Sequence, residues 1–123
     1  MNTKRQELTR AELEIMQILW QIEKGFVNDI LEAMPTPKPA YNTVSTIVRI
    51  LEKKGFVAHR AYGKSHEYYP VVNRKEYTSA FMTGVLNSFF GGSLGNMVSF
   101  LSHDKGITVS EADEIIRMLQ NKE

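Results

Sequence analysis

Hydrogen-bonding side chains recur at helical spacing between residues 41 and 54. They are Asn42, Ser45, Thr46, Arg49 and Lys53. In a helix that turns about 100° per residue, these side chains fall within a sector of roughly 100°. A solvated helix face is usually rich in Glu, Lys and Gln, whereas short amides and hydroxyls beside an arginine can reach base edges in a nucleic-acid groove. The pattern favours a DNA-reading face, with a plain exposed face as the alternative.

The residue types on this segment suit particular contacts with DNA. We expect Arg49 to bind a guanine or a phosphate, Asn42 to form paired hydrogen bonds with adenine, and Tyr41 to contact the DNA backbone. The predicted DNA-contacting residues of this segment are Tyr41, Asn42, Thr43, Ser45, Thr46 and Arg49.

A second group of polar residues lies near a predicted turn further along the chain. Lys64 and His66 are expected at the tip of a hairpin, with Arg60 on the adjoining strand. Cationic residues there should meet phosphates or the minor groove. The alternative is an ordinary solvated hairpin, because exposed turns carry such residues in any case.

The residue types and their spacing argue against a catalytic site or a metal site. The chain has no cysteine, which excludes disulfides, thiolate metal sites and thiol nucleophiles. His59, His66 and His103 are scattered, with no two at the i, i+4 spacing of a helical metal pair. Neither G-x-S-x-G nor G-x-x-x-x-G-K occurs, and the glycine-rich stretch 91–95 lies between helical segments, which indicates a helix break rather than a phosphate loop. We predict no enzyme, no cofactor and no metal.

Three helices are predicted before the hairpin. The first starts at the capping-box pattern Thr9 to Glu12 and ends at Gly25. A second, short helix follows a tight turn and stops at the proline-rich stretch 35–39. The third runs from about Tyr41 to Lys54. The apolar residues expected to face the core at i, i+3, i+4 and i+7 are Ile15, Ile18, Leu19, Ile22, Val27, Ile30, Leu31, Met34, Val44, Ile47, Val48 and Leu51.

The pattern then changes to that of strands. Phe56–Tyr62 and Glu67–Val71 are rich in β-branched and aromatic residues, and Gly63–His66 supplies the turn between them. Short helices with a tight turn followed by a hairpin are the order of a winged helix-turn-helix. We therefore predict a mainly α fold with a small β-hairpin wing (α+β), in which residues 1–73 form a DNA-binding domain.

Residues 74–123 are predicted to form three amphipathic helices, with a break at Gly91–Ser93. A segment this short rarely buries enough surface to be stable alone, so its apolar stripes should face a second copy of the chain. The predicted dimerisation residues are Phe81, Val85, Leu94, Met97, Val98, Leu101, Ile115, Ile116 and Leu119. The alternative is that these helices fold back on the first domain. A homodimer should bind a near-palindromic operator in double-stranded DNA.

Composition agrees with a DNA partner. The 123 residues are 42% hydrophobic and 24% charged, as in an ordinary globular protein. Residues 1–75 carry 12 Lys and Arg against 8 Asp and Glu, whereas residues 76–123 carry 3 against 6. The basic first part suits a polyanion, although the excess is modest. No apolar run is long enough to cross a bilayer and the first ten residues are polar, so a cytoplasmic protein is expected.

Over nearly its whole length the sequence resembles the BlaI/MecI penicillinase-repressor family. The matching segments are LEIMQILW at 13–20, YNTV at 41–44, KKGFV at 53–57 and YYP at 68–70. The resemblance implies a dimeric repressor that covers an inverted-repeat operator, commonly upstream of β-lactamase or penicillin-binding-protein genes.

The resemblance also implies how the repressor is released. A membrane-bound sensor metalloprotease leads to cleavage in the dimerisation helices, and the matching bond here is Ser99-Phe100. Members that control β-lactam resistance prefer asparagine where this chain has Ser99. Copper-responsive relatives carry a cysteine pair that this chain lacks, which disfavours copper as the inducer.

Two other functions fit the same fold. A small molecule bound between the carboxy-terminal helices could release a winged-helix repressor from DNA. Alternatively, the winged helix could be a protein-interaction module without a DNA target, although the polar face of the third helix argues against this.

Overall fold

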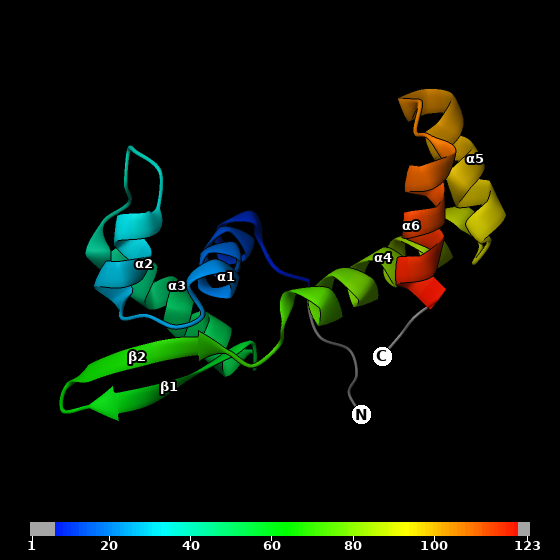
Figure 1. Cartoon of the computed structure of the whole chain (residues 1–123). Helices are drawn as coiled ribbons and strands as arrows, with labels where there is room; N and C mark the ends of the chain where they lie inside the picture. Colours follow the sequence, from blue (N-terminus) through cyan, green and yellow to red (C-terminus); the bar gives the residue numbers. More distant parts are fainter. Residues whose placement is uncertain (1–6, 121–123) are drawn as a thin grey trace. The chain divides into compact units, whose positions relative to one another are not determined.

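The computed structural model describes residues 7–120, apart from the side chains of residues 105 and 118–120. The chain divides into two compact units, one ending at Arg74 and the other beginning at Lys75 (Figure 1). Each unit is described by itself below.

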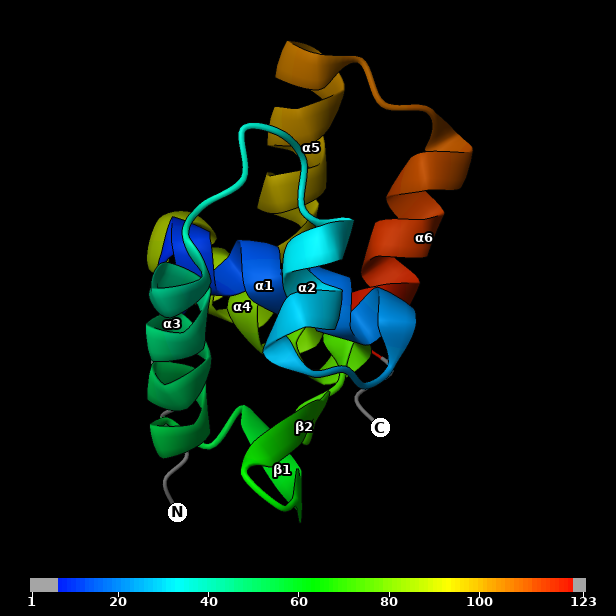
Figure 2. The same cartoon turned by 90° about the vertical axis from the view of Figure 1, so that its left-hand side faces the viewer.

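The first unit contains three helices and a hairpin. The helices are α1 (Arg10–Ile22), α2 (Val27–Ala33) and α3 (Tyr41–Lys53). They are followed by the antiparallel strands β1 (Val57–Tyr62) and β2 (Ser65–Pro70), paired in register from Val57↔Pro70 to Tyr62↔Ser65. Both views show the hairpin as a wing extending from one side of the helices (Figures 1 and 2). The predicted mainly α fold with a hairpin wing is confirmed.

The predicted apolar stripes meet in one core. The fully buried side chains contributed by the three helices and by the residues that follow them are Ile15, Met16, Leu19, Ile30, Val44, Val48, Leu51 and Phe56. Trp20 joins the end of the hairpin to this core, because its indole Nε1 donates a hydrogen bond to the Val72 carbonyl oxygen at 2.9 Å. These contacts fix α3 against the rest of the unit and leave its opposite face exposed.

The start of α1 is joined to the end of α3. Thr9 and Glu12 form the predicted capping box, with reciprocal backbone-to-side-chain hydrogen bonds of 2.9 and 3.1 Å. Lys54 Nζ lies 2.9 Å from Oε1 of Glu12, whose residue is only 5% exposed. Burial raises the pKa of the Glu12 carboxyl, but the Thr9 N–H and the Lys54 ammonium outweigh it, so the pKa is lowered overall.

The prediction that α1 ends at Gly25 is wrong. The helix ends at Ile22, and Glu23 caps it with φ at 77° while its N–H bonds to the Leu19 carbonyl. Gly25 instead pairs with Tyr68 of β2 through two backbone hydrogen bonds of 2.9 and 2.8 Å. A Cβ atom at Gly25 would lie 2.9 Å from Cδ1 of Ile22 and 3.0 Å from Cβ of Asp29, so a residue without a side chain is favoured at this position.

The predicted four-residue turn of the hairpin is also wrong. The strands are joined by Gly63 and Lys64 alone, and His66 belongs to β2. Gly63, with φ at 63°, occupies the first central position, where tight hairpins favour glycine because φ is positive. One glycine therefore suffices for the reversal, and pairing continues two residues closer to the tip than the composition indicated.

The second unit contains α4 (Arg74–Phe90), α5 (Leu94–Lys105) and α6 (Val109–Gln120). The predicted break at Gly91–Ser93 separates α4 from α5, and the Ser93 hydroxyl accepts a hydrogen bond from Asn96 N–H at the start of α5. Thr108 and Glu111 form a second reciprocal cap before α6. The prediction that α4 is amphipathic is wrong: its apolar side chains are spread around the helix, and none of its residues is buried. No helix in the described part of the chain is long and apolar enough to span a bilayer.

Candidate nucleic-acid interface

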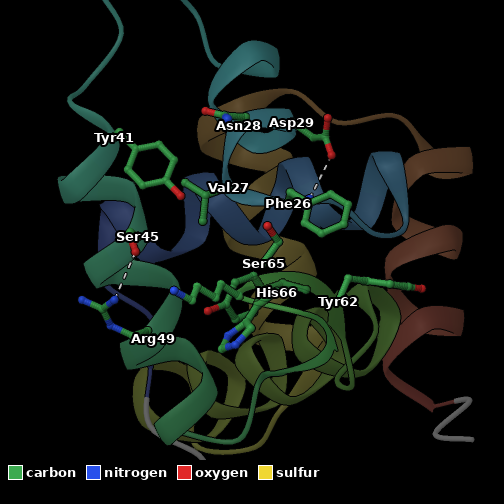
Figure 3. A pocket seen from close by; sticks show the side chains of 12 residues that line it. Phe26, Val27, Asn28, Asp29, Tyr41, Ser45, Arg49, Tyr62, Ser65 and His66 are labelled. Carbon is green, nitrogen blue, oxygen red and sulfur yellow. Dashed lines mark hydrogen bonds between the residues drawn. The ribbon is translucent and has the colours of Figure 1, made fainter.

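A half-open groove of about 650 Å³ lies between α3 and the wing. Figure 3 shows side chains from three places converging on it: the start of α2, one face of α3 and the hairpin. The lining residues are Phe26, Val27, Asn28, Asp29, Tyr41, Ser45, Arg49, Tyr62, Lys64, Ser65, His66 and Tyr68.

The α3 wall of the groove consists of residues at i, i+4 and i+8. Tyr41, Ser45 and Arg49 stand one above the other on this face. Arg49 Nη1 donates a hydrogen bond to Ser45 Oγ at 3.2 Å. Because a guanidinium carries five N–H donors, this bond orients Arg49 and leaves donors for a ligand in the groove.

The hairpin wall carries Lys64 at the tip and His66 on β2. Tyr68 is only 4% exposed. Burial raises the pKa of its phenol, and the nearby Glu52 carboxylate raises it further. The Tyr68 hydroxyl therefore stays protonated near neutral pH and contributes a hydrogen-bonding group without charge.

Arg49 also borders a second, shallower hollow on α3, of about 470 Å³. Its lining residues are Thr46, Arg49, Ile50, Glu52 and Lys53. Arg49 thus lies on the ridge between two concave surfaces of the same helix. A side chain in that position can reach a polyanion that lies along either hollow.

Five of the nine predicted DNA-contacting residues line the groove, namely Tyr41, Ser45, Arg49, Lys64 and His66. Thr46 lies in the second hollow, whereas Asn42 and Thr43 are exposed on α3 outside both. Arg60 is exposed on β1 opposite Glu67, also outside both hollows, and a hydrogen bond with the Tyr62 hydroxyl raises its already high pKa. The structure therefore brings together α3 and the wing tip but leaves Arg60 apart from them.

The contribution of α2 to the groove was not predicted from the sequence. Phe26, Asn28 and Asp29 line the groove because the bridge between Gly25 and Tyr68 holds the start of α2 against the hairpin. Asp29 caps its own helix by accepting a hydrogen bond from Phe26 N–H at 2.9 Å. The ring centroids of Phe26 and Tyr62 lie 5.8 Å apart. Only the unusual position of Gly25 just before an apolar run could have signalled this close approach.

The interpretation of the histidines as scattered needs correction. His59 and His66 stack face to face, with ring centroids 4.0 Å apart and planes 7° from parallel. Antiparallel pairing brings them together, because His59 lies opposite Tyr68 and His66 opposite Ala61 on the neighbouring positions of the hairpin. His59 Nδ1 also lies 2.7 Å from Glu52 Oε2 of α3.

The electrostatics of the groove favour an anion. Arg49 and Lys64 lie on facing walls, and Asp29 is the acidic residue among the lining side chains. No side-chain hydrogen bond caps α3, and Thr43 N–H bonds to the Ala40 carbonyl oxygen at 3.0 Å, so the N–H groups of Tyr41 and Asn42 are the ones at this end that an anion could reach. Among the described residues there is no group of three or more His, Asp or Glu that could hold a metal ion. The arrangement can bind and position a phosphate-bearing ligand by hydrogen bonds and charge.

The residues predicted for dimerisation and cleavage lie in the second unit. Phe81 is 42% exposed, and among the predicted dimerisation residues whose side chains are described, only Met97 is buried in the single chain. The others with described side chains, Val85, Leu94, Val98, Leu101, Ile115 and Ile116, are partly buried, and the side chain of Leu119 lies outside the described residues. Ser99 and Phe100 are exposed on α5, and the Phe100 ring contacts Phe90 with centroids 5.6 Å apart.

Known proteins resemble this chain along nearly its whole length. The family model for the penicillinase repressor matches residues 8–121. The penicillinase repressor of Bacillus licheniformis is 29% identical over 116 residues, which cover 93% of this chain and 90% of that protein. The methicillin resistance regulatory protein MecI of Staphylococcus aureus strain N315 is 25% identical over 123 residues, covering 99% and 100% of the two chains. The solution structure of the DNA binding domain of the repressor BlaI is similar with a TM-score of 0.53 and 26% identity, covering 62% of this chain and 94% of that one.

Proposed function

This chain belongs to the penicillinase repressor family, and we propose that it is a homodimeric transcriptional repressor that binds an inverted-repeat operator and is released by proteolysis. Members of the family are DNA-binding repressors and not enzymes. A cytoplasmic location follows from that function, because the operator is there.

The observation that carries the DNA-binding role is the groove between α3 and the wing. It places a hydrogen-bonding arginine on one wall and a lysine on the other, Arg49 and Lys64. In a winged helix the exposed face of such a helix enters the major groove while the wing meets the backbone or the minor groove. We therefore propose that Arg49 reads a guanine and that Tyr41 and Lys64 contact phosphates.

The exposed apolar surface of the second unit supports a homodimer. Phe89 is 76% exposed and Val109 is 80% exposed, and α4 buries no residue within the single chain. Apolar surface of this kind is stabilised when a partner covers it. A two-fold dimer would present two copies of α3 to successive major grooves, so its operator should be an inverted repeat.

Cleavage at Ser99-Phe100 would act on a helix with little support of its own. Among the described side chains of α5, only Met97 is buried, and glycines flank the helix at Gly92 and Gly106. A protease binds its substrate as an extended chain, so α5 must unwind before cleavage, and a weakly packed helix unwinds readily. Cutting there separates Phe100 and α6 from α4 and would dissolve the dimer. We propose that a membrane sensor metalloprotease starts this process.

A gel shift with titrated salt tests the DNA-binding role. Purified protein is mixed with the DNA upstream of its own gene, with an unrelated duplex of equal length as competitor. We expect preferential retention of the upstream DNA and a steep loss of affinity as salt rises, because phosphate contacts release counterions. Equal retention of both duplexes would argue against a specific operator in that DNA, and no retention at any salt would overturn DNA binding.

The same assay separates proteolytic release from release by a small molecule. Protein cut at Ser99-Phe100 should run as monomers and lose the retained band, whereas the substitution Phe100→Ala should preserve the band if it blocks the cut. If the small-molecule fraction of a cell extract releases intact protein from the DNA, the ligand-responsive alternative is favoured instead.

A further inference from the structure

His59 links α3 to the wing. Its Nδ1 atom lies 2.7 Å from Oε2 of Glu52, near the carboxyl end of α3. Because an ionised carboxylate can only accept, the Nδ1–H of His59 donates this hydrogen bond. The His59 ring also stacks on the ring of His66, with the ring centroids 4.0 Å apart. A continuous path therefore runs from α3 through His59 to a residue that lines the groove.

The path matters because a two-stranded hairpin is marginally stable without support. The wing is held by the buried Tyr68 near its base and by the bridge to Gly25, both on the side toward α2. The contact of His59 with Glu52 ties the wing to α3. The side chains of Glu52 and His59 are about one-third exposed, so solvent reaches this contact.

We infer that His59 is a positioning residue for DNA binding, which holds the wing and the His66 ring at a fixed place relative to α3. This inference rests on the proposed role of the groove as the DNA interface. His59 does not line the groove. It therefore affects DNA binding indirectly, through the position of His66 and of the wing. If the tie to Glu52 is lost, Lys64 and His66 are no longer held opposite Arg49, and binding weakens.

Variants of His59 with different hydrogen-bonding ability test the inference. His59→Asn keeps an N–H donor near the position of Nδ1, whereas His59→Leu removes the donor. Glu52→Gln removes the carboxylate, and His103→Gln serves as the control because His103 lies in the other unit. Full-length proteins are compared by fluorescence anisotropy on the DNA upstream of their own gene, at one pH and constant ionic strength.

The expected result is a loss of affinity that depends on the hydrogen-bond donor at position 59. His59→Leu should bind about two- to fivefold more weakly than the unsubstituted protein, the range expected for a partly exposed charged contact. His59→Asn and His103→Gln should bind as the unsubstituted protein does, and Glu52→Gln, which keeps only a neutral acceptor, should fall between them and His59→Leu. Equal losses in His59→Leu and His59→Asn, or no loss in His59→Leu, would overturn the inference.

A second measurement keeps failure of the inference separate from failure of DNA binding. Amide hydrogen exchange of β1 and β2 is followed without DNA for the unsubstituted protein and for His59→Leu. Faster exchange in the hairpin of the variant, with α1 unchanged, supports the tie between wing and α3. Equal exchange in the two proteins overturns it, even if neither protein binds the duplex.

Discussion

The guanidinium of Arg49 donates a hydrogen bond to the hydroxyl of Ser45, one turn earlier on α3, over 3.2 Å. This bond directs a long, flexible side chain along the face of the helix that borders the groove. The remaining N–H donors of Arg49 are then displayed where a base edge can approach. The relationship makes Arg49 the residue of α3 on which specific recognition should depend most.

Replacing Arg49 by alanine should weaken operator binding about 10- to 100-fold, since a good arginine contact to guanine contributes about 1–3 kcal/mol of discrimination. The loss should be larger for the operator than for unrelated DNA, so the ratio of the two affinities should fall. Competition gel shifts at fixed salt measure both. Arg10→Ala is the matched control, because it removes the same charge from an exposed position that does not line the groove. Equal losses in the two variants would show that Arg49 acts only through its charge.

Lys64 should behave differently from Arg49. Lys64→Ala at the wing tip removes a charge expected to meet a phosphate, so binding should weaken by a similar factor on all duplexes. The slope of log affinity against log salt should fall by about 1. Salt titrations of the variant and the unsubstituted protein provide the measurement. An unchanged slope would mean that the wing tip stays clear of the DNA backbone.

The helices were predictable because their signals are local. The capping box of Thr9 and Glu12, the apolar stripes and the break at Gly91–Ser93 depend on residues within a few positions of each other, and the structure follows them. The exception is α4, whose apolar residues do not form one stripe, so spacing alone gave no correct face. The exposed face of α3 was predictable for the same reason, since it lies opposite the buried Val44, Val48 and Leu51.

The rest of the candidate site depends on contacts between residues far apart in the chain. Gly25 meets Tyr68, and Glu52 meets His59 and through it His66. The partners in these pairs are not related by a regular spacing along the sequence. The register of the hairpin decides whether His59 and His66 share a face, and that register depends on a turn two residues shorter than composition indicated. The α2 wall and the histidine stack therefore became visible only in three dimensions.

Glu12→Gln should lower the free energy of unfolding of the first unit by about 1–3 kcal/mol at pH 7, because a nearly buried charged hydrogen bond to Lys54 is lost. Trp20, the one tryptophan of the chain, reports on this unit in urea unfolding followed by fluorescence. Glu14→Gln is the control, since Glu14 is exposed on the same helix.

The effect of Glu12→Gln should also depend on pH. The pKa of Glu12 in the folded protein is lowered from its ordinary value of 4.5. Its contribution to stability is therefore fully present above that value and is lost as pH falls through the lower folded pKa. The difference between the two proteins should shrink in acid. A constant difference down to the acid unfolding region would show that packing, rather than charge, accounts for the loss.

Gly25→Ala should destabilise the first unit by about 1–3 kcal/mol, the usual cost of forcing extra atoms into a packed site. The new Cβ would lie 2.9 Å from Ile22 Cδ1 and 3.0 Å from Asp29 Cβ. Adding Ile22→Val removes the first of these atoms and should restore part of the loss, as seen in a double-mutant cycle of urea unfolding. Strict additivity of the two substitutions would mean that the contact with Ile22 is not the source of the strain.

Phe89→Asp should weaken the proposed homodimer by at least about 10-fold, because a buried aromatic residue at the centre of an interface often contributes more than 1 kcal/mol. Phe89 is 76% exposed in the single chain, so an aspartate there costs the folded monomer little and acts mainly where a second copy would cover the ring. Sedimentation equilibrium gives the dissociation constant. Val71→Asp is the matched control, since Val71 is 51% exposed in the first unit and should leave the dimer intact.

If Phe89→Asp sediments like the unsubstituted protein, α4 is not at the interface and the dimer must use α5 and α6. If the unsubstituted protein is itself a monomer, no dimer holds two DNA-binding units together. An inverted-repeat operator would then no longer be expected.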